Sequence, residues 1–218
     1  YDCLTGNLPQ NISEGCGENV IVDDGTCIYT PDEFEFNQST LQAFYFVVSA
    51  DIDNESLVEL DDWIGAFNGD VCVGAWPWVG AYTTIPVMGD DDSDFTEGYM
   101  TSGDIPSFVV YDGSEGSYYP AVASSDFEWS INSFNELEFI DVYPDCNEDL
   151  GGSAYLDDCG ICSGGNTGHI ENSNDIGCGC FADSPLTYYL DIDSDGEGYG
   201  DGELYCSYLG DTFTYNTG

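Results

Sequence analysis

A run of carboxylates near the C-terminal end of the chain has the residue types and the spacing of a metal site. The segment LDIDSDGEGYGDGE places acidic side chains mostly at alternate positions, with glycines between them that permit sharp turns. Calcium ions prefer six to eight oxygen ligands from such loops, including backbone carbonyls. We therefore predict a calcium site with ligands drawn from Asp191, Asp193, Asp195, Glu197, Tyr199 and Asp201.

Two registers of this loop can be drawn. Counted from Asp191, the first, third and fifth positions are Asp and the sixth is Gly196, as in an EF-hand loop. The twelfth position is Gly202, however, where that loop needs a bidentate Glu. Counted from Asp193, the string DSDGEGYGD fits better and adds the backbone carbonyl of Tyr199. The alternative to both is a solvated acidic turn. The same two alternatives apply to the acidic cluster 90–94, where we favour a solvated loop over a second cation, and to residues 157–158, which either hold an ion or face water.

Ten cysteines form an even set, which favours an oxidising compartment and up to five disulfides. Spacings such as CGIC and CGC would also suit zinc, but reduced metal clusters rarely occur among N-glycosylation sequons. The pairing cannot be derived from the sequence. The predicted disulfide cysteines are Cys3, Cys16, Cys27, Cys72, Cys146, Cys159, Cys162, Cys178, Cys180 and Cys206.

The charge of the chain limits its partners. Among 218 residues there are 43 Asp and Glu, one His, and neither Lys nor Arg. A net charge of -43 repels polyanions, which excludes nucleic acid or an anionic membrane bound through a basic patch. Such self-repulsion also implies bound cations or a salty medium. Copies of the chain can meet only through β-edges, apolar contacts, shared cations or sugars.

The same composition argues against most enzyme classes. Without Lys or Arg there is no Schiff-base lysine and no arginine clamp for phosphate. The only histidine, His169, lies in a glycine-rich loop and has no legible Ser or Cys partner. Hydrolysis of glycosides by a carboxylate pair remains chemically open, but the sequence nominates no pair. We therefore expect a protein that is not an enzyme.

Short apolar runs separated by turn residues predict the fold. Seven of them are rich in β-branched and aromatic residues, and two are joined by an Asn68-Gly69 turn typical of a tight hairpin. We predict a mainly β chain: an immunoglobulin-like β-sandwich flanked by small disulfide-rich, calcium-binding loop modules. The predicted strands are 43–50, 63–67, 71–76, 83–88, 107–111, 117–123 and 137–142.

The predicted domain boundaries follow changes in composition. Residues 1–31 are a Cys-rich stapled segment and 32–143 the sandwich. Residues 144–184 form a Cys/Gly-rich module, and 185–218 a calcium-binding repeat that stops before its pattern ends. Since the chain starts at Tyr1 without Met or signal peptide, we expect a processed piece of a longer protein. It has no apolar run long enough for a transmembrane helix, so we expect no membrane insertion.

Sugars enter the predictions in two ways. The N-x-S/T sequons at Asn11, Asn37 and Asn54 are candidate glycosylation sites if they lie at the surface. The rings of Trp76, Trp78 and Tyr82 could stack on a glycan, although burial in the sandwich is the more common role of such aromatics. Glycans are therefore candidate partners.

Two segments resemble known repeat families. TYYLDIDSDGEGYGDGELYC is similar to the calcium repeats of thrombospondin-type and related secreted bacterial proteins, with Glu197 where that family usually has Asp. DLGGSAYLDDCGICSGGNTG resembles Cys/Gly-rich repeats of long secreted or surface-anchored bacterial proteins. The resemblance implies an extracellular or cell-surface structural module of a filament, stalk, adhesin or matrix protein, meeting copies of itself or neighbouring repeats. The alternative is a carbohydrate-binding module of a secreted enzyme.

Overall fold

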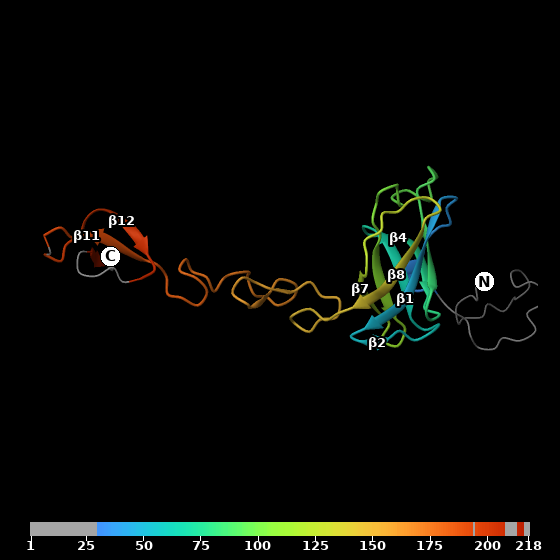
Figure 1. Cartoon of the computed structure of the whole chain (residues 1–218), viewed down its shortest axis with the longest axis horizontal. Coiled ribbons are helices and arrows are strands. Elements are labelled where there is room, and N and C mark those ends of the chain that lie inside the picture. The colour runs from blue at the N-terminus through green and yellow to red at the C-terminus, as the bar shows by residue number, and fades with distance from the viewer. Residues whose placement is uncertain (1–29, 194, 208–212, 216–218) are drawn as a thin grey trace, which may run out of the picture. The chain divides into compact units, whose positions relative to one another are not determined.

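The computed structural model describes residues 30–193, 195–207 and 213–215. The chain divides into two compact units, unit 1 (Tyr1–Tyr143) and unit 2 (Pro144–Gly218), which are described separately. The described residues are mainly β, as predicted, and their only helical element is a single 3-10 turn, η1 (Asp32–Phe34) (Figure 1). None of their helices is long and apolar enough to cross a membrane. The finer division into four parts stays a prediction.

Unit 1 is built on one curled sheet of eight strands. Its order is β2-β1-β8-β7-β6-β3-β4, and β5 pairs with β1 on the same edge as β2, opposite β8 (Figure 1). Within this sheet, β7 pairs with β6 over five residues but with β8 only at Val122 and Ala123. The strands are β1 (Gln42–Ile52), β2 (Glu55–Ser56), β3 (Trp63–Asn68), β4 (Val71–Pro77), β5 (Thr83–Met88), β6 (Ser107–Asp112), β7 (Ser117–Ala123) and β8 (Phe134–Val142).

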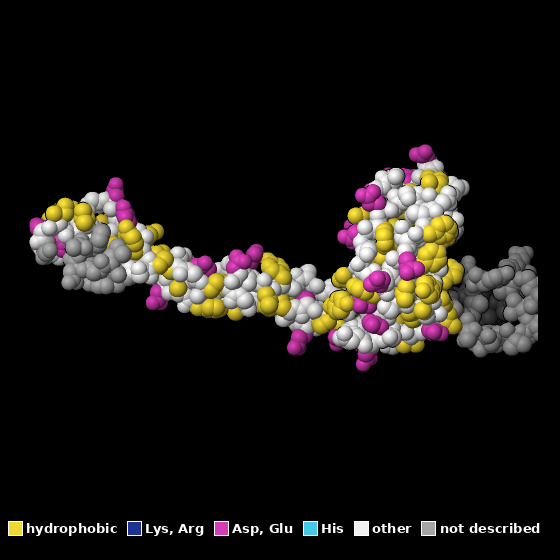
Figure 2. Space-filling model, in the orientation of Figure 1, with side chains coloured by type: hydrophobic (Ala, Val, Ile, Leu, Met, Phe, Trp, Pro, Cys, Tyr) yellow, Lys and Arg dark blue, Asp and Glu magenta, His cyan; other side chains and the backbone are white. Residues whose placement is uncertain are grey.

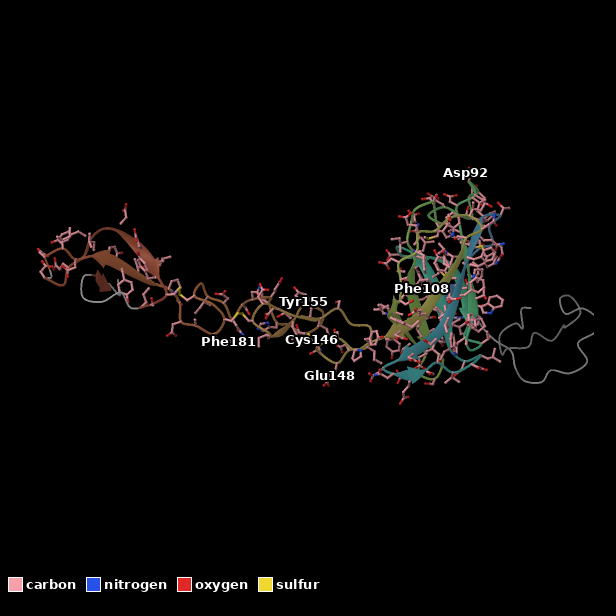
Figure 3. All side chains as sticks on the ribbon, in the orientation of Figure 1. Asp92, Phe108, Cys146, Glu148, Tyr155 and Phe181 are labelled. Carbon is pink, nitrogen blue, oxygen red and sulfur yellow. A yellow bond between two sulfur atoms is a disulfide. The ribbon has the colours of Figure 1, made fainter. Side chains whose placement is uncertain are left out.

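All seven predicted strand segments are strands, and the alternation of their side chains explains the core. In β1, Ala43, Tyr45 and Val47 are buried, whereas Phe44 and Phe46 between them face outward. Phe108 of β6 is buried inside the curl (Figure 3). The immunoglobulin-like arrangement is not confirmed, because the described strands of unit 1 form one continuous sheet. The short strand β2 and the turn η1 were not predicted.

The predicted tight hairpin exists, but its centre lies one residue later than expected. Asn68 pairs with Val71, so the two loop residues are Gly69 and Asp70. Only Gly69 has a positive φ, +60°, which matches the turn type that places Gly first. A β-bulge between Ala66 and Phe67 accompanies this shift of register.

A second apolar cluster covers the outer face of β3 and β4. Phe34 of η1 is fully buried there against Trp63, Cys72 and Ala75, with partly buried aromatic rings around it. The ring of Tyr118 lies 5.3 Å from that of Phe34 in an edge-on contact. We call this set the Phe34 cluster. It fixes the segment before β1 onto the sheet.

Unit 2 contains little regular structure. It has a two-stranded pair, β9 (Tyr155–Leu156) with β10 (Cys162–Ser163), and a three-stranded sheet in the order β12-β11-β13. The sheet strands are β11 (Leu186–Leu190), β12 (Tyr199–Tyr205) and β13 (Phe213–Tyr215). This sheet was not predicted, because its residues read as loop. Three disulfides join its cysteines: Cys146–Cys162, Cys159–Cys180 and Cys178–Cys206.

Candidate functional site: a carboxylate loop between two strands

The acidic loop begins where β11 ends. Asp191 follows the last residue of that strand and is 5% exposed, although it is a charged residue type. Its Oδ2 accepts a hydrogen bond from the backbone N–H of Gly196 at 3.0 Å, which closes the loop. Gly196 has φ +88°, a value that L side chains rarely adopt. The glycine thus lets the chain fold back over the buried carboxylate.

Three carboxylates meet at this loop. Ligand oxygens of Asp191, Asp193 and Asp195 all lie within 4.8 Å of one another. Oδ1 of Asp191 is buried and has no hydrogen-bond partner among the residues that the structure describes. A buried carboxylate oxygen without a partner is costly, and a cation at the meeting point would satisfy it. The donor set is all oxygen, which suits a hard ion such as calcium.

The structure favours the register that begins at Asp191. Glu197 and Asp201 lie outside the group of three, and Tyr199 is an exposed residue of β12 paired with Leu190. The backbone N–H of Glu197 instead donates to Oδ1 of Asp195 at 2.8 Å. The preference for a loop starting at Asp193 stays a prediction, but that register leaves out the buried carboxylate of the group of three.

The acidic cluster after β5 is occupied by the protein's own donors. Oδ2 of Asp91 accepts hydrogen bonds from both the N–H and the hydroxyl of Thr40 at 3.0 Å, and Oδ1 accepts from the buried Thr96 hydroxyl at 2.9 Å. These bonds, that from the Thr40 backbone first, hold the pKa of Asp91 well below its usual range. Asp92 lies at the tip of this loop (Figure 3). The cluster therefore ties the segment before β1 to the loop.

Asp62 is a buried carboxylate of unit 1. Its Oδ2 accepts from the N–H of Val58 at 2.6 Å, and its Oδ1 from the N–H of Gly113 at 2.9 Å. Burial raises its pKa, and these two bonds only partly oppose that effect. With both oxygens engaged, Asp62 joins two loops and offers no free ligand atom.

Unit 2 repeats one hydrogen-bonded turn three times. In each case the side chain of an Asp accepts the backbone N–H groups two and four residues later, a pattern that replaces regular secondary structure. Each pair of distances lies between 2.8 and 3.2 Å. The three residues are Asp145, Asp157 and Asp175. The sequence signal was an Asp one to three residues before a cysteine, which was not recognised.

Asp157 also organises the only histidine. Its Oδ2 accepts from the fully buried Ser163 hydroxyl at 2.8 Å, and that hydroxyl lies 2.9 Å from Nδ1 of His169. Nε2 of His169 in turn lies 3.2 Å from the hydroxyl of Ser173. Burial opposes ionisation of Asp157, but bonds from Ile161, Ser163 and other donors outweigh it and lower the pKa. Asp157 thus closes a turn, whereas a solvated or ion-holding residue was expected.

Of the seven predicted disulfide cysteines that the structure describes, six are paired. Cys72 is instead a buried free thiol that lies 3.7 Å from the carbonyl of Gly74, so its predicted disulfide is not formed. It occupies an interior position in the Phe34 cluster, where a cysteine acts as a small apolar side chain. Cys3, Cys16 and Cys27 lie outside the described residues, as does the sequon at Asn11.

The predicted glycan-stacking and glycosylation residues differ in how accessible they are. Trp76 and Tyr82 are 47% and 60% exposed, whereas Trp78 is only 6% exposed and cannot stack on a glycan. Asn54 lies exposed in the β1–β2 turn. Asn37 is exposed too, but its side-chain amide donates to the carbonyl of Phe95 at 3.3 Å.

The surface of unit 1 reflects the composition of the chain. Acidic and apolar side chains are interspersed over the face shown in Figure 2, without a basic patch between them. Compared with models of protein families, with curated proteins and with solved structures, the chain gives no match.

Proposed function

We propose that the chain is a non-enzymatic structural module of an extracellular or cell-surface assembly, such as a filament, stalk, adhesin or matrix protein. Its partners are copies of itself or neighbouring repeats of a longer chain, and disulfides and calcium make it rigid. The observation that carries the proposal is the unpartnered, buried oxygen of Asp191 within the loop closed by Cys178–Cys206. A cation bound there would stabilise a unit that has little apolar core of its own.

The overlapping disulfides support the same role. Small loop-rich modules need covalent or metal staples, because they cannot bury enough apolar surface to fold otherwise. Disulfides of this kind persist in oxidising compartments, which is consistent with an extracellular location. Charge supports the calcium part of the proposal, because a divalent ion lowers the self-repulsion of a chain with net charge -43.

Thermal unfolding with and without chelator tests the proposal. Calcium should raise the melting temperature of unit 2, magnesium at the same concentration should raise it less, and an unchanged midpoint would sink the calcium assignment. Electron microscopy of the native material tests the assembly. Regular polymers of the chain support the proposal, whereas isolated monomers contradict it.

A carbohydrate-binding module is the second candidate. The observation that favours it is the exposure of Trp76 and Tyr82, since aromatic faces that project into solvent are suited to stacking on sugar rings. A shift in electrophoretic mobility on a polysaccharide gel would support this reading.

A further inference from the structure

We infer that this chain is built to carry tension between its two ends: β1 and β8 form a clamp loaded in shear, and the disulfides of unit 2 pass the load around the carboxylate loop. The inference rests on the proposed structural role and adds a mechanical one. It follows from strand pairing and disulfide connectivity alone, so it does not depend on how the two units are oriented.

The clamp consists of the first long strand and the last strand of unit 1. β1 and β8 run parallel and pair at eight residue positions, from Phe44 with Phe134 to Ile52 with Val142. Once the Phe34 cluster and the bonds of Thr40 to Asp91 have yielded, tension from the N-terminal side enters β1 at Gln42. Tension toward unit 2 leaves β8 at Val142. Because the strands are parallel, these are opposite ends of the ladder. The two strands are therefore pulled past each other along their length.

Loading in shear makes the hydrogen bonds resist together. In a ladder pulled from one end, bonds break one after another, whereas sliding one strand past its neighbour strains all of them at once. The bond from Phe44 N–H to Ser133 and that from Asp53 N–H to Val142 extend the β1–β8 pairing at its two ends, with lengths of 3.0 and 2.9 Å. The ladder is thus closed at both of the points where force is applied.

Aromatic rings reinforce the outer side of the clamp. Phe134 of β8 stacks on Phe44 at 5.6 Å between ring centroids and on Phe46 at 6.0 Å, both from β1, with interplanar angles of 16° and 17°. Phe134 is 70% exposed, so it contributes little to the core. Its stacking instead links the two loaded strands, because its ring contacts two rings of β1.

In unit 2 the disulfides form a ladder with overlapping steps. Cys146 is bonded to Cys162, while Cys159, three residues before Cys162, is bonded to Cys180. Cys178, two residues before Cys180, is in turn bonded to Cys206. The covalent route from the first to the last cysteine therefore crosses three disulfides and only two short pieces of peptide.

This route makes unit 2 almost inextensible. The three Cα–Cα distances are 5.6, 5.2 and 5.2 Å. With the two short peptide pieces, the route has a maximum length of roughly 35 Å, whereas the same stretch of chain without disulfides would extend to roughly 200 Å. Asp191, Asp193 and Asp195 lie between Cys178 and Cys206, away from this route. Tension carried between Cys146 and Cys206 would then bypass the cation site. β13 follows Cys206 and pairs with β11, so it lies outside this protected route.

Pulling single molecules of the full chain tests the clamp. Handles at the two termini load β1 and β8 in shear. A handle on a clickable amino acid that replaces Asn54, at the tip of the β1–β2 turn, together with the C-terminal handle, peels the same ladder from one end. We expect the unfolding force to be about three-fold lower in the peeling direction, because its bonds break in sequence. Equal forces in the two directions would overturn the clamp.

The same pulling experiment tests the disulfide ladder of unit 2. When unit 1 unfolds, the oxidised chain should lengthen by roughly 340 Å, and reductant should add roughly 170 Å from unit 2. The paired variant Cys178→Ser with Cys206→Ser should add roughly 75 Å, and calcium should change the force of that step only in this variant. If the extension of the unfolded chain did not depend on reductant, the disulfide ladder would be overturned. Because melting with chelator involves no force, failure here is distinguishable from failure of the proposed calcium module.

Discussion

The ring of Phe34 lies directly over Gly65 of β3, so closely that a Cβ at position 65 would come within 2.6 Å of the ring carbon Cε1. Phe34 is fully buried, and its neighbours in the Phe34 cluster leave the ring little room to move. We therefore expect Gly65→Ala to destabilise unit 1 by about 1 to 3 kcal/mol through overpacking. Chemical denaturation of the full chain measures this change in the free energy of unfolding.

The control for this prediction is a double-mutant cycle. Phe34→Ala alone should cost about 3 to 5 kcal/mol, since it empties a buried aromatic site. In the double variant the added methyl group meets no ring. The double variant should therefore lose less stability than the sum of the losses in the two single variants. Strict additivity would show that Gly65 is needed for its backbone and not for its contact with Phe34.

The carboxylate loop makes a prediction that separates the two registers. With calcium at a hundred times its dissociation constant, binding should stabilise unit 2 by about 2.7 kcal/mol if the unfolded chain binds none. Asp191→Asn should remove most of this difference between calcium and chelator. Asp201→Asn, the matched control, should retain it, because Asp201 lies outside the group of three carboxylates. Loss of the difference in Asp201→Asn but not in Asp191→Asn would restore the register that begins at Asp193.

Acid should destabilise unit 2 through its hydrogen-bonded aspartates. The pKa of Asp145 is lowered, chiefly by the hydrogen bond from the Ala154 N–H. Burial opposes ionisation of Asp157, but its hydrogen bonds outweigh this effect, so the pKa of Asp157 is lowered as well. A carboxyl whose folded pKa is depressed stabilises the fold above its ordinary pKa and loses that contribution as pH falls through the folded value. The loss should therefore lie below about pH 4.

Asp157→Asn isolates this effect from the relief of charge repulsion that acid also brings. The variant should be less stable at neutral pH, because an amide nitrogen cannot accept the bonds from Ser163 and Asn172. Its stability should fall less steeply in acid, as measured by circular dichroism between pH 7 and pH 2. A slope that equals that of the unmodified chain would contradict the role of Asp157.

The strands of unit 1 could be predicted because their residues repeat with the two-residue period of a sheet. Seven runs were recognised, and the Asn68-Gly69 pair located a hairpin to within one residue. The parallel pairing of β1 with β8 could not be predicted, because the two strands lie far apart in the sequence and nothing local encodes their register. Phe34 was missed for a similar reason, because its burial depends on a glycine about thirty residues away.

In unit 2 the composition predicted disulfide bonds but not which cysteines pair with each other. Ten cysteines allow many pairings, and the overlapping order of the three bonds appears only once the turns at Asp145, Asp157 and Asp175 are in place. The carboxylate string predicted a cation loop, whereas the buried, unpartnered oxygen of Asp191 is a property of the folded chain. Local patterns therefore located the acidic loop, and only packing shows which of its carboxylates come together.

The exposed aromatics give a test of the carbohydrate alternative. Trp76→Ala and Tyr82→Ala should leave the melting temperature nearly unchanged, because both rings are largely exposed. If unit 1 binds glycans, these variants should abolish the retardation on a polysaccharide gel. Trp78→Ala, the buried control, should instead cost about 3 to 5 kcal/mol of stability. Retardation that survives both exposed variants would exclude this surface as a glycan platform.

Cys72 should resist alkylation as long as unit 1 is folded. Burial raises the pKa of its thiol to about 11, and only the thiolate reacts. That shift alone slows labelling near neutral pH by about a hundredfold relative to an ordinary thiol, and steric protection by the Phe34 cluster adds to it. Iodoacetamide followed by mass spectrometry of the Cys72 peptide should show label only after denaturant is added without reductant. Rapid labelling of the native chain would contradict the burial, and a Cys72 that stays unlabelled in denaturant until reduced would show that it is disulfide-bonded after all.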